Sequence, residues 1–301
     1  MKSLHSKVGQ REFCAARQRD KHLRIEVAGR IDRQPTGAND VTRVQNRCRE
    51  TFAARLFQSR LHLSNSVQVS FTVALSGGSS PKKMFEILGN DERLKKQVKA
   101  GLWDYVHFFW TDERHVPPDH AESNYKLAND SMLSPLGIRE ANIHRIKGEL
   151  KDASEAARQY EAEILRGSPN SNGQLPKFDL IFLGMGSDGH TVSLFPGTKA
   201  LQEEKRLVVS NWVGKYYTDR ITMTAPLLNN ASCVVFLVCG QDKALAVKAA
   251  LEGRHDPQQL PAQLISPESG KLIWLLDSAA ASLLQTVHEE PESSLSGAIS
   301  D

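Results

Sequence analysis

Four polar segments follow apolar, strand-like runs along the chain, and each carries residue types that could bind or transform an anionic substrate. The first is Ser76-Gly77-Gly78-Ser79-Ser80-Pro81, after residues 71–75. Glycines let the backbone approach an anion closely, hydroxyls add donors, and a helix N-terminus attracts negative charge. Pro81 suits the first turn of such a helix, with Ser80 as its cap. The segment predicts a phosphate-binding loop, with an ordinary glycine turn as the alternative.

Charged residues follow the next apolar run, residues 105–110. Asp112, Glu113 and Arg114 lie at the end of a strand that is too apolar to lie at a surface. Charges in such a place need a partner or a substrate. Arg114 could bind a carboxylate-like or phosphate oxygen, and Asp112 could orient Arg114 or a water molecule. A structural ion pair is the alternative interpretation.

A glycine-rich segment with a histidine follows residues 178–183. Gly184-Met185-Gly186-Ser187-Asp188-Gly189-His190-Thr191 contains the G-x-G-x-x-G pattern of dinucleotide-binding folds. That function needs an acid at the end of the following strand, whereas Glu203 and Glu204 precede the next apolar run. We therefore favour a tight loop in which His190 acts as a base and Asp188 orients its imidazole, and a structural histidine is the alternative.

Two cations complete the candidate site. Arg220 opens the strand-like residues 220–224, and Lys243 opens the helix that follows residues 239–242. Because the helix dipole disfavours a lysine in the first turn, an anionic ligand would explain the presence of Lys243 there. A solvated surface lysine is the alternative.

The elements that must position these segments alternate between strand-like and helical patterns. The strand-like runs are residues 71–75, 105–110, 178–183, 232–239 and 271–276. The helical stretches include residues 81–88, 153–165 and 243–251. This alternation predicts an α/β fold with a doubly wound, largely parallel sheet and helices on both faces. Ligands bind beyond the carboxyl ends of the strands in such sheets, which is where the chemistry-bearing segments lie.

Composition excludes several classes of protein. Residues 1–34 hold nine Lys and Arg against four Asp and Glu, so the rest of the chain carries −2 of the overall charge of +3, which argues against a nucleic-acid partner. The longest apolar run, residues 233–239, is far shorter than the roughly 20 residues of a membrane-spanning helix, and we expect a cytoplasmic protein without a membrane partner. The four cysteines show no C-x-x-C spacing and indicate neither a disulfide framework nor a metal site; Cys233 and Cys239 are expected to be small buried hydrophobes.

Together the segments resemble the 6-phosphogluconolactonase family, from about residue 40 to about residue 285. The matching stretches are residues 75–81, Asp112-Glu113-Arg114, Glu122-Ser123-Asn124-Tyr125 and residues 178–197. The resemblance implies a doubly wound α/β fold shared with glucosamine-6-phosphate deaminases. It also implies hydrolysis of 6-phospho-D-glucono-1,5-lactone to 6-phosphogluconate in the oxidative pentose phosphate pathway, without a cofactor. Functional coupling to glucose-6-phosphate dehydrogenase is a further expectation.

The resemblance also assigns roles to residues. The general base falls on His190, its neighbouring acid on Asp188, and the strand-end pair on Asp112 and Arg114, with Arg114 stabilising developing charge. The phosphate-binding positions fall on Ser76, Gly77, Gly78, Ser79, Arg220 and Lys243. No metal is required, because a δ-lactone is already an activated ester that needs alignment, a water molecule and charge stabilisation.

Three other functions remain as alternatives. A glucosamine-6-phosphate deaminase or isomerase would be expected to have a glutamate five residues after the histidine, where this chain has Phe195. A non-catalytic sugar-phosphate sensor would not need His190 together with Asp112 and Arg114. An NAD-dependent dehydrogenase would need the acid that is missing after the glycine motif.

The predicted domain organisation has three parts. Apolar residues at steps of three and four between Val41 and Leu61, preceded by Asp40 as a cap, predict a helix that opens the folded body. We expect residues 1–39 to be a poorly ordered basic extension, residues 40–285 to be the lactonase domain, and residues 286–301 to be a polar tail.

Overall fold

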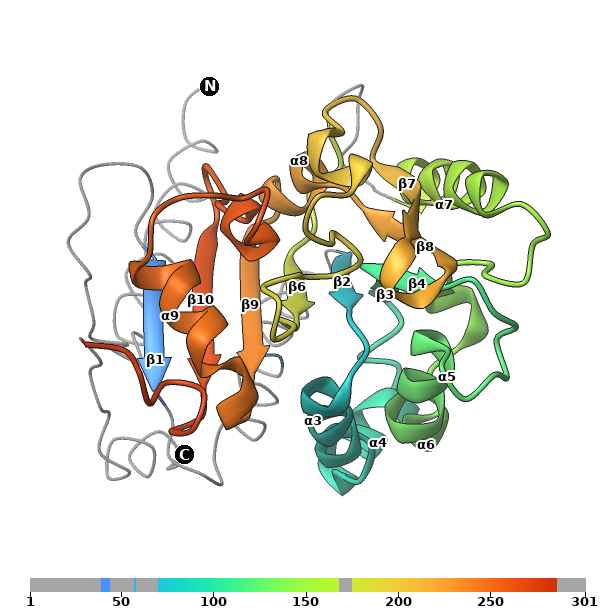
Figure 1. Cartoon of the computed structure of the whole chain (residues 1–301). Helices are drawn as coiled ribbons and strands as arrows, with labels where there is room; N and C mark the ends of the chain where they lie inside the picture. The colour runs from blue at the N-terminus through green and yellow to red at the C-terminus, as the bar shows by residue number, and fades with distance from the viewer. Residues whose placement is uncertain (1–38, 44–56, 58–69, 168–174, 286–301) are drawn as a thin grey trace, which may run out of the picture.

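The computed structural model describes residues 39–43, 57, 70–167 and 175–285, and within these residues the strands form two sheets. The larger sheet is parallel, and its spatial order is β1 (Asn39–Arg43), β10 (Lys271–Leu276), β9 (Cys233–Val238), β6 (Leu180–Leu183), β2 (Phe71–Leu75), β3 (Val106–Trp110) and β5 (Ile143–His144). The smaller sheet is antiparallel, in the order β4 (Asp112–Arg114), β8 (Thr218–Met223) and β7 (Val208–Val213). Figure 1 shows the parallel sheet from β1 to β3, with the antiparallel sheet beyond β3.

Helices connect the strands of the parallel sheet. They are α3 (Ser79–Gly89), α4 (Glu92–Lys99), α5 (Asn124–Ala128), α6 (Ser134–Leu136), α7 (Ala153–Gly167), α8 (Ala225–Asn229) and α9 (Ala244–Glu252). Every residue of β2, β6 and β9 is buried, which shows that both faces of the sheet are covered. The predicted doubly wound α/β fold is confirmed.

The strand order reverses direction between β2 and β6. From β2 the chain adds β3 and β5 on one side, whereas β6, β9 and β10 extend the sheet on the other side. β2 and β6 are direct neighbours, with Val73 opposite Leu180 and Ala74 opposite Ile181. The loops that follow these two strands therefore leave the sheet on either side of one crevice, the usual ligand site of such folds.

The predicted strands and helices are confirmed at their positions in the sequence, although their ends differ. The exception is the helix predicted from Val41. Residues 39–43 form β1, which pairs in parallel with β10, so the helix predicted from Val41 with Asp40 as its cap is wrong at its start. Pairing with the edge of β10 overrides the helical periodicity there, as tertiary contacts often do. Phe57 is helical and buried; the other residues of that predicted helix beyond residue 43, the extension at residues 1–38 and the tail at residues 286–301 lie outside the described residues.

The start of α3 also differs from expectation. Gly78 rather than Ser80 is the N-cap, at a backbone φ of 106°, and its carbonyl accepts the backbone N–H of Lys82 at 3.2 Å. A positive φ is open to glycine at little cost, so the helix can begin at Ser79, two residues earlier than a Ser80 cap would allow.

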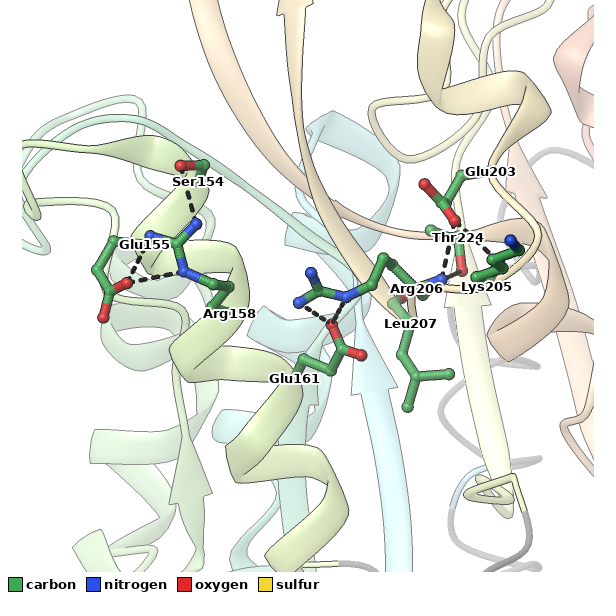
Figure 2. Close-up of polar contacts among 9 residues, drawn as sticks. All are labelled: Ser154, Glu155, Arg158, Glu161, Glu203, Lys205, Arg206, Leu207 and Thr224. Carbon is green, nitrogen blue, oxygen red and sulfur yellow. Dashed lines mark hydrogen bonds and ion pairs between the residues drawn. The ribbon is translucent and has the colours of Figure 1, made fainter.

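The antiparallel sheet was not predicted. An ion pair connects it to α7. Arg206, just before β7, donates Nε to Glu161 Oε2 on α7 at 2.8 Å (Figure 2). Glu203 accepts the backbone N–H groups of Lys205 and Arg206, and Thr224 donates its hydroxyl to the Arg206 carbonyl at 2.7 Å. Through β4 and β8 this sheet positions three of the predicted site residues, Asp112, Arg114 and Arg220. None of the helices in the described ranges is long and apolar enough to cross a membrane.

Candidate active site

A pocket of about 240 Å³ lies at the carboxyl ends of the central strands. It brings together most of the predicted site residues, namely Ser76, Gly77, Gly78, Ser79, Asp112, Arg114, His190 and Lys243. Asp188 and Arg220 do not line the pocket. Asp188 contacts His190, and Arg220 lies opposite Arg114 in the β4–β8 register.

The loop after β2 lets the backbone and a helix N-terminus face the pocket. A Cβ atom on Gly77 would lie 1.8 Å from Asn124 Oδ1, so a side chain does not fit there. The eleven-residue helix α3 begins at Ser79, and its first residues line the pocket. Its unpaired N–H groups and dipole favour an anion at this place.

Ser76 joins the ends of three neighbouring strands. Its hydroxyl donates to the carbonyl of Phe182 at 2.8 Å and lies 2.6 Å from Thr111 Oγ1. Since the only hydroxyl proton of Ser76 goes to Phe182, the side chain is not a donor for a ligand in this arrangement. Ser76 therefore holds the loop in place, and the donors for an anion come from the backbone beyond it.

Glu113 explains why the segments at residues 112–114 and 122–125 occur together. Its carboxylate is 2% exposed and accepts four hydrogen bonds, from the backbone N–H groups of Arg114, Asn124 and Tyr125 and from Ser123 Oγ, at 2.7–3.0 Å. Burial raises the pKa of this carboxyl, and the backbone hydrogen bonds oppose the rise. Glu113 thus fixes the start of α5 against β4.

We expect Glu113→Gln to destabilise the fold. The amide nitrogen of glutamine would face donors that the carboxylate now satisfies, and unsatisfied buried groups cost roughly 1 to 3 kcal/mol each. Urea unfolding should show a loss in the free energy of unfolding of about that size. A variant as stable as the parent would contradict the structural role of this carboxylate.

Asp112 links three loops around the pocket. Its Oδ2 accepts the hydroxyl of Ser193 at 2.7 Å, and Asn124 Nδ2 donates to its carbonyl at 2.9 Å and lies 3.3 Å from its Oδ1. Asn124 and Ser193 had no predicted role, although both lie in the stretches that carry the family resemblance. The signal that could have found them is their position beside strand-end charges.

Arg114 and Arg220 form an unusual pair of like charges. They lie directly opposite each other on β4 and β8, an arrangement that is unfavourable without a counter-charge. Among the described residues, no hydrogen-bond acceptor pairs with the buried Nε of either arginine. Arg114 donates Nη1 to the carbonyl of Glu122 at 2.8 Å, and burial together with the charge of Arg114 lowers the pKa of Arg220, which is 8% exposed. An anionic ligand would relieve this repulsion.

His190 and Asp188 form a hydrogen-bonded pair in the loop after β6. His190 Nδ1 is bonded to Asp188 Oδ1, and this bond is the main cause that holds the pKa of Asp188 far below its usual value. A proton on Nδ1 shared with a carboxylate leaves Nε2 as the basic nitrogen. The imidazole also stacks on the ring of Phe195, with centroids 4.1 Å apart.

Gly186 makes room for this pair. A Cβ atom there would lie 2.1 Å from His190 Nδ1 and 2.6 Å from Asp188 Oδ1. The glycines that suggested a dinucleotide motif therefore serve in part to let the imidazole and carboxylate approach each other. The segment forms a tight loop around the imidazole, as expected, and the role of His190 as a base stays a prediction.

We expect Gly186→Ala to lower turnover by at least tenfold, because the methyl group must displace the imidazole from the carboxylate, and small misplacements of catalytic groups are costly. Steady-state kinetics would measure this. Gly214→Ala is the matched control, since a Cβ atom at Gly214 meets nothing within 4 Å. Equal kinetics for the two variants would show that the contact at Gly186 has no role.

Lys243 and Cys239 border the pocket from the β9 side. Lys243 ends the short helix η5 (Gln241–Lys243) and is the N-cap of α9 rather than its first residue; its Nζ lies 2.5 Å from Asp242 Oδ2. Cys233 is buried as expected, whereas Cys239 is only half-buried and lines the pocket, because it follows the last residue of β9.

Comparison with known proteins identifies the family. Residues 46–274 match the model of glucosamine-6-phosphate isomerases/6-phosphogluconolactonase. A 6-phosphogluconolactonase of a Synechocystis species is 43% identical over 215 residues, covering 71% of this chain and 85% of the relative. The chloroplastic 6-phosphogluconolactonase 3 of Arabidopsis thaliana is 42% identical, covering 71% of this chain and 66% of the relative.

Solved structures agree with this match. The 6-phosphogluconolactonase from Trypanosoma cruzi superposes with a TM-score of 0.72 at 26% identity, over 86% of this chain and all of that chain. A monomeric glucosamine-6-phosphate deaminase shares the fold, with a TM-score of 0.64 at 21% identity over 81% of this chain and 99% of that chain. The chain belongs to the glucosamine-6-phosphate isomerase/6-phosphogluconolactonase family.

Proposed function

We propose that this protein is a 6-phosphogluconolactonase that hydrolyses 6-phospho-D-glucono-1,5-lactone to 6-phosphogluconate in the oxidative pentose phosphate pathway. The observation that carries the proposal is the His190–Asp188 pair at the edge of a pocket that also holds a helix N-terminus and cationic side chains. A base beside an anion-binding surface suits a phosphorylated, electrophilic substrate. The names of the relatives at about 40% identity point to the same activity.

In the proposed mechanism, His190 Nε2 takes a proton from a water molecule as the water attacks the C1 carbonyl of the lactone. Asp188 keeps the other ring nitrogen protonated and stabilises the imidazolium that forms. The imidazolium then returns the proton to the departing ring oxygen, so the C1–O bond breaks and the free carboxylic acid and hydroxyl form. The acid then loses its proton to solvent. His190 thus ends in its starting state.

Arg114 stabilises the negative charge that develops on the carbonyl oxygen. It reaches the pocket, and its Nε has no partner among the described residues. A fixed cation acts strongly here because it needs no reorganisation as charge develops. Asp112, held by Ser193 and Asn124, keeps the surrounding loops in register.

The phosphate group binds where the backbone after β2 and the first turn of α3 face the pocket. Gly77, Gly78 and Ser79 supply the close backbone approach, with Ser76 holding the loop. Lys243 adds positive charge in the pocket lining, and Arg220 adds it from its position opposite Arg114 on β8. Binding energy from this remote group aligns C1 with the water and the base.

A substrate panel tests the proposal against its alternatives. We expect hydrolysis of the phosphorylated lactone and no ammonia release from glucosamine 6-phosphate, since the ring of Phe195 covers one face of His190. A sensor would bind 6-phosphogluconate without turning over the lactone, and a dehydrogenase would bind NAD in calorimetry. Either result would overturn the proposal. The cytoplasmic location and the coupling to glucose-6-phosphate dehydrogenase stay predictions.

A further inference from the structure

The turn between β7 and β8 contacts Asp188 directly and is connected to His190 through the ring of Phe195. This turn consists of the short helix η4 (Gly214–Tyr216) and Tyr217. Lys215 Nζ lies 3.3 Å from Asp188 Oδ2, the carboxylate oxygen that His190 does not use. Both oxygens of Asp188 are therefore engaged, one by the imidazole and one by the lysine.

Aromatic rings connect the same turn to the imidazole. Tyr216 meets Phe195 edge to face, with centroids 5.8 Å apart, and Phe195 stacks on His190. The Tyr216 ring also lies 5.4 Å from Lys215 Nζ and 5.4 Å from the guanidinium carbon of Arg220. Cations near an aromatic ring are attracted to it, so these contacts help to fix the geometry of the turn.

We propose that Lys215 is a positioning residue that holds the Asp188 carboxylate in line with His190, so that this one side chain of the β7–β8 turn helps to set the geometry of the catalytic pair. This inference rests on the proposed lactonase chemistry. Lys215 is exposed and ion pairs of this kind add little to stability, so its effect is on the pair rather than on the fold. The hydrogen bond with Asp188 raises the pKa of Lys215, which stays charged.

Removing the charge of Lys215 should also shift the pH dependence of the reaction in a direction that electrostatics predicts. Lys215 is the cation in contact with the Asp188 carboxylate. The other charged groups nearby are Asp112, Arg114 and Lys243, which line the pocket, and Arg220, which contacts the ring of Tyr216. Without Lys215 the Asp188 carboxylate is less neutralised and attracts positive charge more strongly. We therefore expect the acidic limb of the kcat/KM profile to move to higher pH.

The test is the pH profile of lactone hydrolysis by Lys215→Met and Lys215→Arg. For Lys215→Met we expect kcat to fall roughly three- to tenfold with KM changed less than about twofold, a modest loss because the lysine is exposed. We expect the acidic limb to rise by roughly 0.5 pH unit, the effect of one nearby charge in water-exposed surroundings. Lys215→Arg should recover most of the parent rate.

Two comparisons separate this role from others. In an Asp188→Asn background, Lys215→Met should cost little further kcat, because the two residues act as one unit. Lys205→Met removes an exposed charge before the opposite end of β7, and Tyr217→Asn alters a residue of the same turn that is 85% exposed; both should match the parent.

Three outcomes would overturn the inference while leaving the lactonase proposal intact. The first is an acidic limb that Lys215→Met leaves unchanged. The second is a rise in KM alone, which would make Lys215 a substrate contact. The third is a loss of kcat on Lys215→Met that is as large in the Asp188→Asn background as in the parent. Absence of lactone hydrolysis by the parent enzyme would instead overturn the proposed function on which the inference rests.

Discussion

Replacing His190 by alanine will lower kcat for 6-phosphogluconolactone by about 10²- to 10⁴-fold and leave affinity for the phosphosugar nearly unchanged. A general base contributes about that factor and little ground-state binding. The structure supports the assignment, because Asp188 occupies Nδ1 and leaves Nε2 as the basic nitrogen. Steady-state kinetics, corrected for spontaneous hydrolysis, measure the effect on kcat.

Two further measurements make the His190 result specific. Titration of the variant with 6-phosphogluconate should give a dissociation constant close to that of the parent, and its thermal unfolding should be similar. Asp188→Asn should also lower kcat, since the amide no longer holds the imidazole in the required tautomer. A loss of less than threefold in kcat for His190→Ala would remove His190 from the mechanism.

Alanine at Lys243 or at Arg220 will mainly raise KM. For Lys243, which lines the pocket, losing one charge-assisted contact to a phosphate costs on the order of 1.5 to 3 kcal/mol, or roughly 10- to 150-fold in affinity. The effect should be smaller for Arg220, which does not line the pocket. Some fall in kcat is allowed, because remote binding energy also aligns the reacting carbon. The measurement is the ratio of mutant to parent kcat/KM for the phosphorylated lactone and for glucono-δ-lactone, which lacks the phosphate.

The unphosphorylated lactone is the control in this comparison. Mutant and parent should hydrolyse it about equally. Asp242→Asn is a matched variant for Lys243, because it removes the carboxylate that Lys243 contacts but keeps the lysine charge. If Lys243→Ala and Arg220→Ala damage hydrolysis of both lactones equally, these residues maintain the fold or the catalytic centre, and their assignment to the phosphate is wrong.

The sequence was informative where chemistry follows directly after a buried strand. The loops beginning at Ser76 and Gly184 could be found because parallel strands place their carboxyl ends at one edge, and the structure brings both loops to one pocket. The same reasoning located Asp112 and Arg114. Local spacing also indicated the partner of His190, since Asp188 is only two residues away.

The strand pairings of the antiparallel sheet, and the side-chain neighbours that they create, could not be predicted. β4 has three residues, too few for a recognisable alternation, and its pairing with β8 sets Arg114 against Arg220 from a distance of more than 100 positions in the sequence. Lys215 reaches Asp188 from the turn between β7 and β8, which is a further contact that local spacing does not reveal. β1 was missed for a related reason, because the edge of β10, not local periodicity, determines its structure.

The most direct test of the account is the rate of hydrolysis of freshly generated 6-phosphoglucono-1,5-lactone with the purified protein, compared with the spontaneous rate and with His190→Ala. The parent should enhance the rate strongly, and the variant should lose most of this enhancement. A parent protein that leaves the spontaneous rate unchanged, while binding 6-phosphogluconate in the same buffer, would contradict the central claim and show a site that binds phosphosugars without hydrolysing the lactone.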